Sequence, residues 1–285
     1  MRAGILAAIG AGLLFAAPPA LAADAPVGLV DDPCASAPTV PPALLAATAA
    51  RYDARRKDPP PPVPLADLAA YRAAEAEARK RDWPNLCLYK ADNARLMVGP
   101  AAARQVVFMG DSITQGWGLA DPAFFRPGRV NRGISGQTTP QMLVRFQADV
   151  AALKPRAVHI MAGTNDIAGN TGPISAADIQ NNIMAMVTIA KANRVAVVLA
   201  SIPPAKVFTW APALKPAEQI RGLNAWLKTY AAREALIYVD YYAAMATPDG
   251  AMKPELTFDG VHPNAAGYAV MEPLTQAALK RALRQ

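Results

Sequence analysis

Three residues of this chain have the types and spacing needed for nucleophilic chemistry. Ser112 follows a short apolar run and a glycine, and His262 lies three residues after Asp259 in a polar segment. A serine hydroxyl is a weak nucleophile that needs an adjacent base, and an imidazole base needs a carboxylate that orients it. We therefore predict acyl transfer, with Ser112 as the nucleophile, His262 as its base and Asp259 as the orienting carboxylate.

The chain has two histidines, which narrows the choice of base. His159 lies within the apolar run 157–161, where a buried core residue is the better interpretation. Ser112 also has a structural alternative, because a serine at the turn into a helix often caps that helix. The presence of further polar clusters along the chain favours the catalytic interpretation of Ser112 and His262.

Hydrogen-bond donors for an oxyanion can come from Ser112, Gly136 and Asn165. The backbone N–H of Ser112 would lie near a helix N-terminus, Gly136 allows its N–H to approach a ligand closely, and Asn165 carries a side-chain amide. Each such donor typically contributes about 3–4 kcal/mol of transition-state stabilisation. Taken singly, Gly136 is equally well a simple turn glycine and Asn165 a residue that stabilises its loop.

These residues need a scaffold that brings distant parts of the chain together. Short runs rich in Val and Ile are typical of strands in a parallel sheet covered on both faces, and they occur at residues 106–109, 130–134, 157–161, 195–202 and 236–241. Helices are expected between them, one capped by Ser175 and Asp178, one beginning at Pro216, and a last one over 265–283. This alternation predicts a doubly wound α/β sandwich, in which ligands bind at the carboxyl ends of the strands. All the polar clusters are therefore expected at one edge of the sheet.

Those clusters also resemble a known family. Residues 108–114 (Phe-Met-Gly-Asp-Ser-Ile-Thr), Gly136, the Gly-Thr-Asn-Asp of residues 163–166 and Asp259-x-x-His262 are similar, in order, to the four blocks of the SGNH (GDSL-like) hydrolases. The resemblance covers residues 104–283, and Ile113 stands where the family's nickname has leucine. It implies a flavodoxin-like three-layer α/β/α sandwich with a five-stranded parallel sheet, and an esterase without a metal or organic cofactor. Asp111 and Asp166 are expected to brace their loops.

The expected substrate is a small-molecule or carbohydrate ester with a short acyl group, above all acetyl. This expectation rests on the resemblance together with the export that residues 1–22 predict, as described below, and the sequence shows no long apolar lid of the kind a lipase uses. A lysophospholipase or thioesterase is the second choice, and a non-enzymatic envelope- or carbohydrate-binding module on a hydrolase fold is the third. Five aromatic residues are expected in loops. Each of them either borders the cleft or packs in the protein core, and the sequence favours neither alternative: Trp117, Phe124, Phe125, Phe208 and Trp210.

The residues before the sandwich divide into two segments. Residues 1–22, with Arg2, an apolar core and a small-x-small end, predict a secretory signal, so that the protein is secreted or periplasmic and keeps no membrane span. A retained membrane anchor is the alternative. Residues 23–103 are expected to form a helical, proline-rich extension, with helices over 44–56 and 65–93, the second broken at Pro84, and non-helical prolines at 59–62. The extension could cover the cleft or dock a partner, and the catalytic domain is expected over 104–285.

The chain has two cysteines, Cys34 and Cys87. In an oxidising compartment they can form one disulfide, and two unrelated buried thiols are the alternative.

The basic residues do not indicate nucleic-acid binding. Such binding would require basic residues clustered with aromatic ones, and it is not expected. The net charge of +7 instead comes with scattered single cations, which predict a solvated basic surface: Arg104, Arg145, Lys191 and Arg233.

Overall fold

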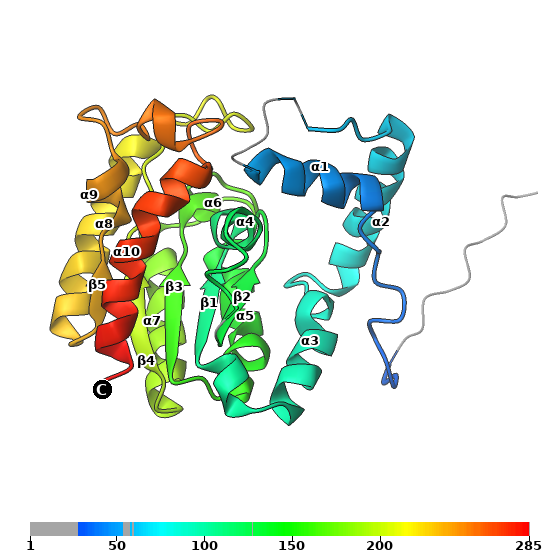
Figure 1. Cartoon of the computed structure of the whole chain (residues 1–285), viewed down its shortest axis with the longest axis horizontal. Helices are drawn as coiled ribbons and strands as arrows, with labels where there is room; N and C mark the ends of the chain where they lie inside the picture. The colour runs from blue at the N-terminus through cyan, green and yellow to red at the C-terminus, as the bar shows by residue number, and fades with distance from the viewer. Residues whose placement is uncertain (1–27, 54–57, 59, 127, 285) are drawn as a thin grey trace, which may run out of the picture. The chain divides into compact units, whose positions relative to one another are not determined.

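A sheet of five parallel strands forms the centre of the structure, a computed structural model (Figure 1). The strand order is β2-β1-β3-β4-β5, which is the order of the flavodoxin-like fold that the family resemblance implies. All residues of β1 and β3 are buried, because helices cover both faces. The strands are β1 Val106–Gly110, β2 Arg129–Gly133, β3 Ala157–Met161, β4 Ala196–Ala200 and β5 Ile237–Val239.

The structure describes residues 28–53, 58, 60–126 and 128–284. The predicted signal segment, residues 1–22, lies outside the described residues. Residues 28–35 belong to a separate unit and consist of bends and turns, whereas residues 36–284 belong to the unit that contains the sheet. Cys34 and Cys87 are both disulfide-bonded. None of the described helices is both long and apolar enough to cross a membrane.

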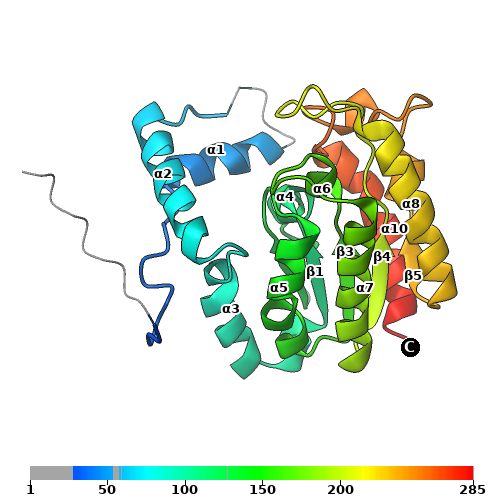
Figure 2. The same cartoon turned by 180° about the vertical axis from the view of Figure 1, so that it is seen from behind.

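Two layers of helices sandwich the sheet. The first comprises α5 (Thr139–Asp149), α7 (Ala176–Ala192) and α8 (Pro216–Arg233), which lie in front of the sheet in Figure 2. The second comprises α4 (Ser112–Ala120), α9 (Tyr241–Met245) and α10 (Ala265–Ala282), in front of the sheet in Figure 1. Each layer packs against its own apolar cluster, so the predicted three-layer α/β/α sandwich is confirmed.

The local signals for helix ends act as the sequence indicates. Ser175 and Asp178 form a reciprocal capping box at the start of α7, and Pro216 is the first residue of α8. Strand β5 is shorter than predicted, because the Asp240 side chain accepts a hydrogen bond from the Ala243 N–H and thereby caps α9. The short elements are α6 Thr164–Ile167, η1 Ala101–Arg104, η2 Ala151–Leu153 and η3 Pro254–Leu256.

The extension contains three helices: α1 Pro42–Tyr52, α2 Leu65–Arg81 and α3 Cys87–Val98. The predicted break at Pro84 is present, since α2 ends three residues before this proline and α3 begins three residues after it. Asn85 in the linker has a φ of 56°, a left-handed conformation that asparagine tolerates better than most residues. The described prolines of the stretch 59–62 are non-helical, as expected.

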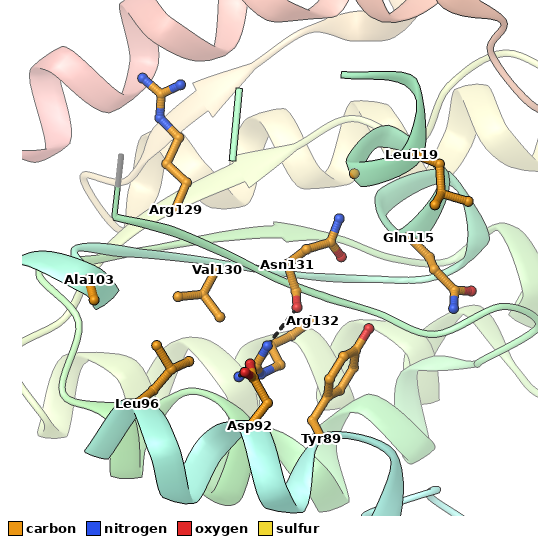
Figure 3. Close-up of a pocket in the computed structure, with 11 residues that line it drawn as sticks. Tyr89, Asp92, Leu96, Ala103, Gln115, Leu119, Arg129, Val130, Asn131 and Arg132 are labelled. Carbon is orange, nitrogen blue, oxygen red and sulfur yellow. Dashed lines mark hydrogen bonds and ion pairs between the residues drawn. The ribbon is translucent and has the colours of Figure 1, made fainter. Parts of the chain in front are cut away.

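Helix α3 lies along the outer edge of β2 (Figure 3). The Arg132 guanidinium of β2 is almost completely buried and donates to Asp92 at 2.8 Å and to Asn93 at 2.6 Å. It also lies over the Tyr89 ring, with 4.5 Å between the guanidinium carbon and the ring centroid. A cavity of about 460 Å³ remains between α3 and the strand edge. The extension therefore covers an edge strand that would otherwise be open to pairing with another chain.

Arg145 does not lie on the solvated surface that the sequence predicts, because it is fully buried. Its guanidinium donates to Asp149 at 2.9 Å, to the Gln137 side chain at 2.5 Å and to the Gly110 carbonyl at 3.0 Å. Burial lowers the pKa of Arg145, and the Asp149 carboxylate opposes that shift. The interpretation was wrong because α5 places this arginine one turn before a buried carboxylate. Lys191 and Arg233 are exposed, as expected.

Removing the Arg145 charge should strongly destabilise the protein. Arg145→Met leaves the Asp149 carboxylate buried without its cation, and breaking such a pair costs about 3–5 kcal/mol of unfolding free energy. Urea denaturation measures this difference. Arg233→Met is the matched control, since its exposed pair with Glu234 contributes about 1 kcal/mol or less. Equal losses in the two variants would contradict the structural role given to Arg145.

Candidate active site

Ser112 is the first residue of α4 and lies directly beyond the carboxyl end of β1. The strand turns sharply into the helix at Gly110, where an added Cβ would lie 2.1 Å from the Thr114 hydroxyl and 2.9 Å from the Met161 carbonyl. No larger residue fits there without displacing a neighbouring strand. The turn presents the Ser112 hydroxyl 2.9 Å from Nε2 of His262, 150 residues further along the chain.

His262 and Asp259 come from one loop that its own hydrogen bonds hold in shape. The Asp259 carboxylate accepts the His262 imidazole Nδ1–H at 2.8 Å through one oxygen, and the backbone N–H groups of His262 and Val261 through the other. The Thr257 hydroxyl donates to the His262 carbonyl at 2.8 Å and accepts from the Gly260 N–H at 3.0 Å. The imidazole is therefore positioned before any substrate binds.

The charge of Asp259 fixes the tautomer of His262. Partial burial raises the pKa of Asp259, but the hydrogen bonds from the imidazole and backbone of His262 outweigh it and lower the value to about 2. An ionised carboxylate can only accept, so Nδ1 of His262 must carry the proton. Nε2 then has a free lone pair that accepts the Ser112 hydroxyl. This arrangement can remove a proton from the serine oxygen as it attacks a carbonyl.

Two backbone N–H groups near Ser112 are available for a developing oxyanion. Gly136 lies in the loop after β2 with a φ of 78°, a left-handed conformation that favours glycine. Among the described residues, neither the Ser112 N–H nor the Gly136 N–H has a hydrogen-bond acceptor. Ser112, Gly136 and His262 all line the same cleft. Polar groups left without a partner beside a nucleophile are what an oxyanion site requires.

Asn165 lies behind these donors and is 3% exposed. Its amide nitrogen donates to the Gln137 carbonyl at 3.0 Å and makes a longer contact of 3.4 Å with Asp111, while its oxygen accepts from Asn170 at 2.8 Å. One amide hydrogen is therefore taken by the loop that carries Gly136, and only the weakly held one is available for a ligand. Sequence reasoning placed Asn165 next to the site but did not anticipate these partners.

Asp111 and Asp166 support the loops, in agreement with the expectation. Asp111 accepts the Ile113 N–H at 2.9 Å at the start of α4, and Asp166 accepts the backbone and hydroxyl of Thr139 at the start of α5. Burial raises the pKa of Asp111 to about 6, although the Ile113 N–H and His262 act in the opposite direction. Burial also raises the pKa of Asp166. His159 is a fully buried core residue, as predicted, with its Nε2 at 2.9 Å from the Tyr241 hydroxyl.

The extension forms one wall of the cleft, whose volume is about 610 Å³. Leucines 44 and 45 of α1 and Leu88 of α3 make this wall partly apolar, and Arg51, Glu75 and Arg79 supply charged groups. The Tyr52 ring of α1 packs edge-on against Phe258, the neighbour of Asp259, with 5.1 Å between centroids. Of the two roles expected for the extension, covering the cleft is therefore the one that the geometry supports.

Of the two alternatives left open for the loop aromatics, ordinary packing holds for most of them, and Trp117 lies in α4 instead of a loop. Trp117, Phe124 and Phe208 are buried and belong to the core, where they stack against Tyr268, Trp117 and Trp210 respectively. Their positions near loop segments concealed that these rings turn inward. Trp210 does border the site: it is 42% exposed, and its ring lies 6.0 Å from the His262 ring. Its indole N–H donates to Asn170, which also donates to the Gly136 carbonyl.

The chain is similar in sequence and in fold to known proteins. Residues 108–270 match the model of the GDSL-like lipase/acylhydrolase family. Esterase TesA of Pseudomonas aeruginosa is 30% identical over 189 residues, which cover 60% of this chain and 85% of that protein. A GDSL-like lipase structure from Bacteroides thetaiotaomicron is 42% identical with a TM-score of 0.68, and the match covers 70% of this chain and 99% of that one. A Bacteroides fragilis protein gives the same TM-score at 46% identity, covering 70% of this chain and 98% of the other.

The raised pKa of Asp111 predicts a pH-dependent effect of Asp111→Asn. The folded protein resists ionising this carboxyl until about pH 6, whereas the unfolded chain ionises it near its ordinary pKa of 3.8. The stabilisation from a protonated Asp111 is thus complete below pH 3.8 and lost as the pH rises through 6. We expect the variant to gain about 2–3 kcal/mol of unfolding free energy relative to the parent over this range, as measured by urea denaturation at each pH.

Asp249→Asn is a control of opposite sign. Hydrogen bonds from Lys206 and Thr247 lower the pKa of Asp249 to about 2. The stabilisation from its charge is therefore present above the ordinary pKa and disappears as the pH falls. The unfolding free energy of Asp249→Asn should thus fall furthest below that of the parent at neutral pH. If the difference in unfolding free energy between Asp111→Asn and the parent does not depend on pH, burial does not raise the pKa of Asp111.

Proposed function

Because the chain belongs to the GDSL-like lipase/acylhydrolase family and is an ester hydrolase, we propose that Ser112, His262 and Asp259 are its catalytic triad. The observation that carries the proposal is the continuous hydrogen-bonded chain from the Ser112 hydroxyl through His262 to Asp259, with distances of 2.9 and 2.8 Å. A nucleophile, a base and an orienting carboxylate in this geometry are the parts that acyl transfer needs.

The reaction proceeds in two halves through an acyl-enzyme. The Ser112 oxygen attacks the ester carbonyl while Nε2 of His262 takes the hydroxyl proton, and Asp259 stabilises the imidazolium that forms. The imidazolium then gives this proton to the leaving alcohol oxygen as the carbon–oxygen bond breaks. Water enters, His262 removes a proton from it, and the water oxygen attacks the acyl carbon. The bond from this carbon to Ser112 Oγ then breaks, the imidazolium returns its proton to Oγ, and the acid leaves.

The N–H groups of Ser112 and Gly136 receive the negative charge on the carbonyl oxygen. Both lack an acceptor among the described residues, so they lose no existing hydrogen bond when the oxyanion forms. The Asn165 amide serves as a third donor when its weakly held hydrogen turns from Asp111 toward the cleft. Gln137 and Asn170 keep the Gly136 loop in place during this step.

The preferred substrate is an ester with a short acyl group, in particular acetyl carried on a carbohydrate. The pattern of residues 1–22 supports export to the periplasm or the medium, where such esters are met. The catalytic domain begins at about residue 104, just before β1 and close to the start of the family match. Residues 23–103 form an extension that shapes the cleft.

Removing the nucleophile should abolish the activity without unfolding the protein. We expect Ser112→Ala to lower kcat for 4-nitrophenyl acetate by about 10⁴-fold or more and to prevent labelling by a fluorophosphonate probe. Ser175→Ala is the matched control, because Ser175 is an exposed serine away from the cleft, and this variant should be labelled like the parent. Labelling that persists in Ser112→Ala would show that another residue is the nucleophile.

A second candidate function is hydrolysis of longer acyl chains in lysophospholipids or thioesters. The observation that favours it is the apolar wall formed by leucines 44, 45 and 88. A series of 4-nitrophenyl esters from acetyl to palmitoyl separates the two functions. We expect kcat/KM to be highest for the shortest chains. A kcat/KM that rises through octanoyl and beyond would overturn the short-acyl assignment and leave the triad intact.

A further inference from the structure

A second, polar pocket adjoins the catalytic cleft on the side of the Gly136 loop. Its volume is about 190 Å³, and it shares Arg79, Asn85 and residues 134–136 with the cleft. A group bound there can therefore be part of the same molecule as an ester that reaches Ser112. The remaining lining residues are Trp83, Gln137, Gln141, Asn170 and Thr171.

The pocket is built jointly by the extension and the sandwich. Arg79, Trp83 and Asn85 come from the end of α2 and the α2–α3 linker, which lie outside the residues matched by the family model. Two hydrogen bonds fix this linker on the loop that carries Gly136 and on the first turn of α5. The Gln137 side chain donates to the Pro84 carbonyl at 2.6 Å, and the Gln141 side chain donates to the Trp83 carbonyl at 2.8 Å. The pocket is thus a fixed feature and not a gap between loosely held parts.

The lining favours a neutral ligand that carries hydroxyl groups. The side-chain amide of Asn85 and the hydroxyl of Ser135 have no partner among the described residues, so both can bond a ligand. Of the described residues, no carboxylate lines the pocket and Arg79 is its one cation, which is paired with Glu75 at 3.0 Å. Trp83 is 43% exposed and offers an apolar ring face with a polar N–H. Amides, a hydroxyl and an aromatic face are suited to the hydroxyls and C–H faces of a sugar ring.

We propose that this pocket, formed by Arg79, Trp83, Asn85 and the Gly136 loop, binds the sugar ring that carries the acyl group. The ring occupies the pocket while its ester projects past Gly136 into the cleft, where Ser112 attacks the carbonyl carbon. Trp83 and Asn85 are then specificity-determining residues that the extension adds to the site. This inference rests on the proposed esterase function and names the alcohol portion of its substrate.

The test compares one substrate that fills the pocket with one that does not. Kinetics are measured on a singly acetylated methyl xyloside and on 4-nitrophenyl acetate, and the ratio of the two kcat/KM values is followed. We expect Trp83→Ala and Asn85→Gly each to lower this ratio about tenfold, mainly through KM for the sugar ester, because each removes contacts to the ring. Glycine tolerates the left-handed backbone of Asn85, so this variant removes the amide without strain. Trp226→Ala, on α8 away from the pocket, should leave the ratio unchanged.

The possible outcomes separate the pocket from the triad. If the parent protein does not hydrolyse 4-nitrophenyl acetate through Ser112, the esterase proposal itself fails. If it does, but neither variant changes the ratio, the sugar pocket is refuted and the esterase proposal stands. Equal losses on both substrates would show that Trp83 and Asn85 only support the fold, which also refutes the pocket. A preference of the parent for a lysophospholipid over the acetylated sugar would refute it as well.

Discussion

The buried ion pair of Arg145 and Asp149 is the constraint on which the site depends. A guanidinium without contact to water is tolerated only when its donors meet acceptors, and those acceptors come from three separate parts of the chain. Gly110 ends the strand that precedes Ser112, Gln137 follows Gly136, and Asp149 in turn accepts from Asn93 of the extension. The turn before Ser112, the loop that carries Gly136 and the extension are therefore all bonded to this ion pair. None of them can shift far without leaving a buried donor or acceptor unpaired.

The loop of His262 and Asp259 is fixed by its own hydrogen bonds and not by the buried ion pair. Here the stabilising groups are local, since Thr257 and the backbone of residues 259–262 hold the carboxylate and the imidazole. The two halves of the site meet at one hydrogen bond, from the Ser112 hydroxyl to Nε2 of His262. Rigid positioning of this kind lowers the reorganisation needed when charge develops at the carbonyl oxygen. Packing of Tyr52 against Phe258 links the loop to the extension as well.

Sequence reasoning succeeds where the signal is local or where a rule of the fold connects distant segments, and it fails where neither applies. The strands, the capping box of Ser175 and the break at Pro84 are each determined by a few neighbouring residues. The meeting of Ser112 with His262 follows from the rule that parallel strands end at one edge. Arg145 was misplaced because its acceptors at 110 and 137 are distant in sequence, and only Asp149 lies at helical spacing. For the aromatic residues the sequence left two alternatives open, since periodicity in short segments does not tell which ring turns inward. The contacts of the extension with the cleft had no sequence signal beyond its composition.

The extension supplies one wall of the cleft and three of the ten residues that line the adjoining polar pocket. The proposed mechanism requires that a tetrahedral centre bonded to Ser112 directs its oxygen toward the N–H groups of Ser112 and Gly136. A crystal structure of the protein inactivated by diisopropyl fluorophosphate tests this most directly, since the phosphorus mimics that centre. We predict a bond from Ser112 Oγ to phosphorus, with the phosphoryl oxygen within hydrogen-bonding distance of both N–H groups. A phosphoryl oxygen directed toward solvent, or phosphorus attached to another residue, would contradict the account.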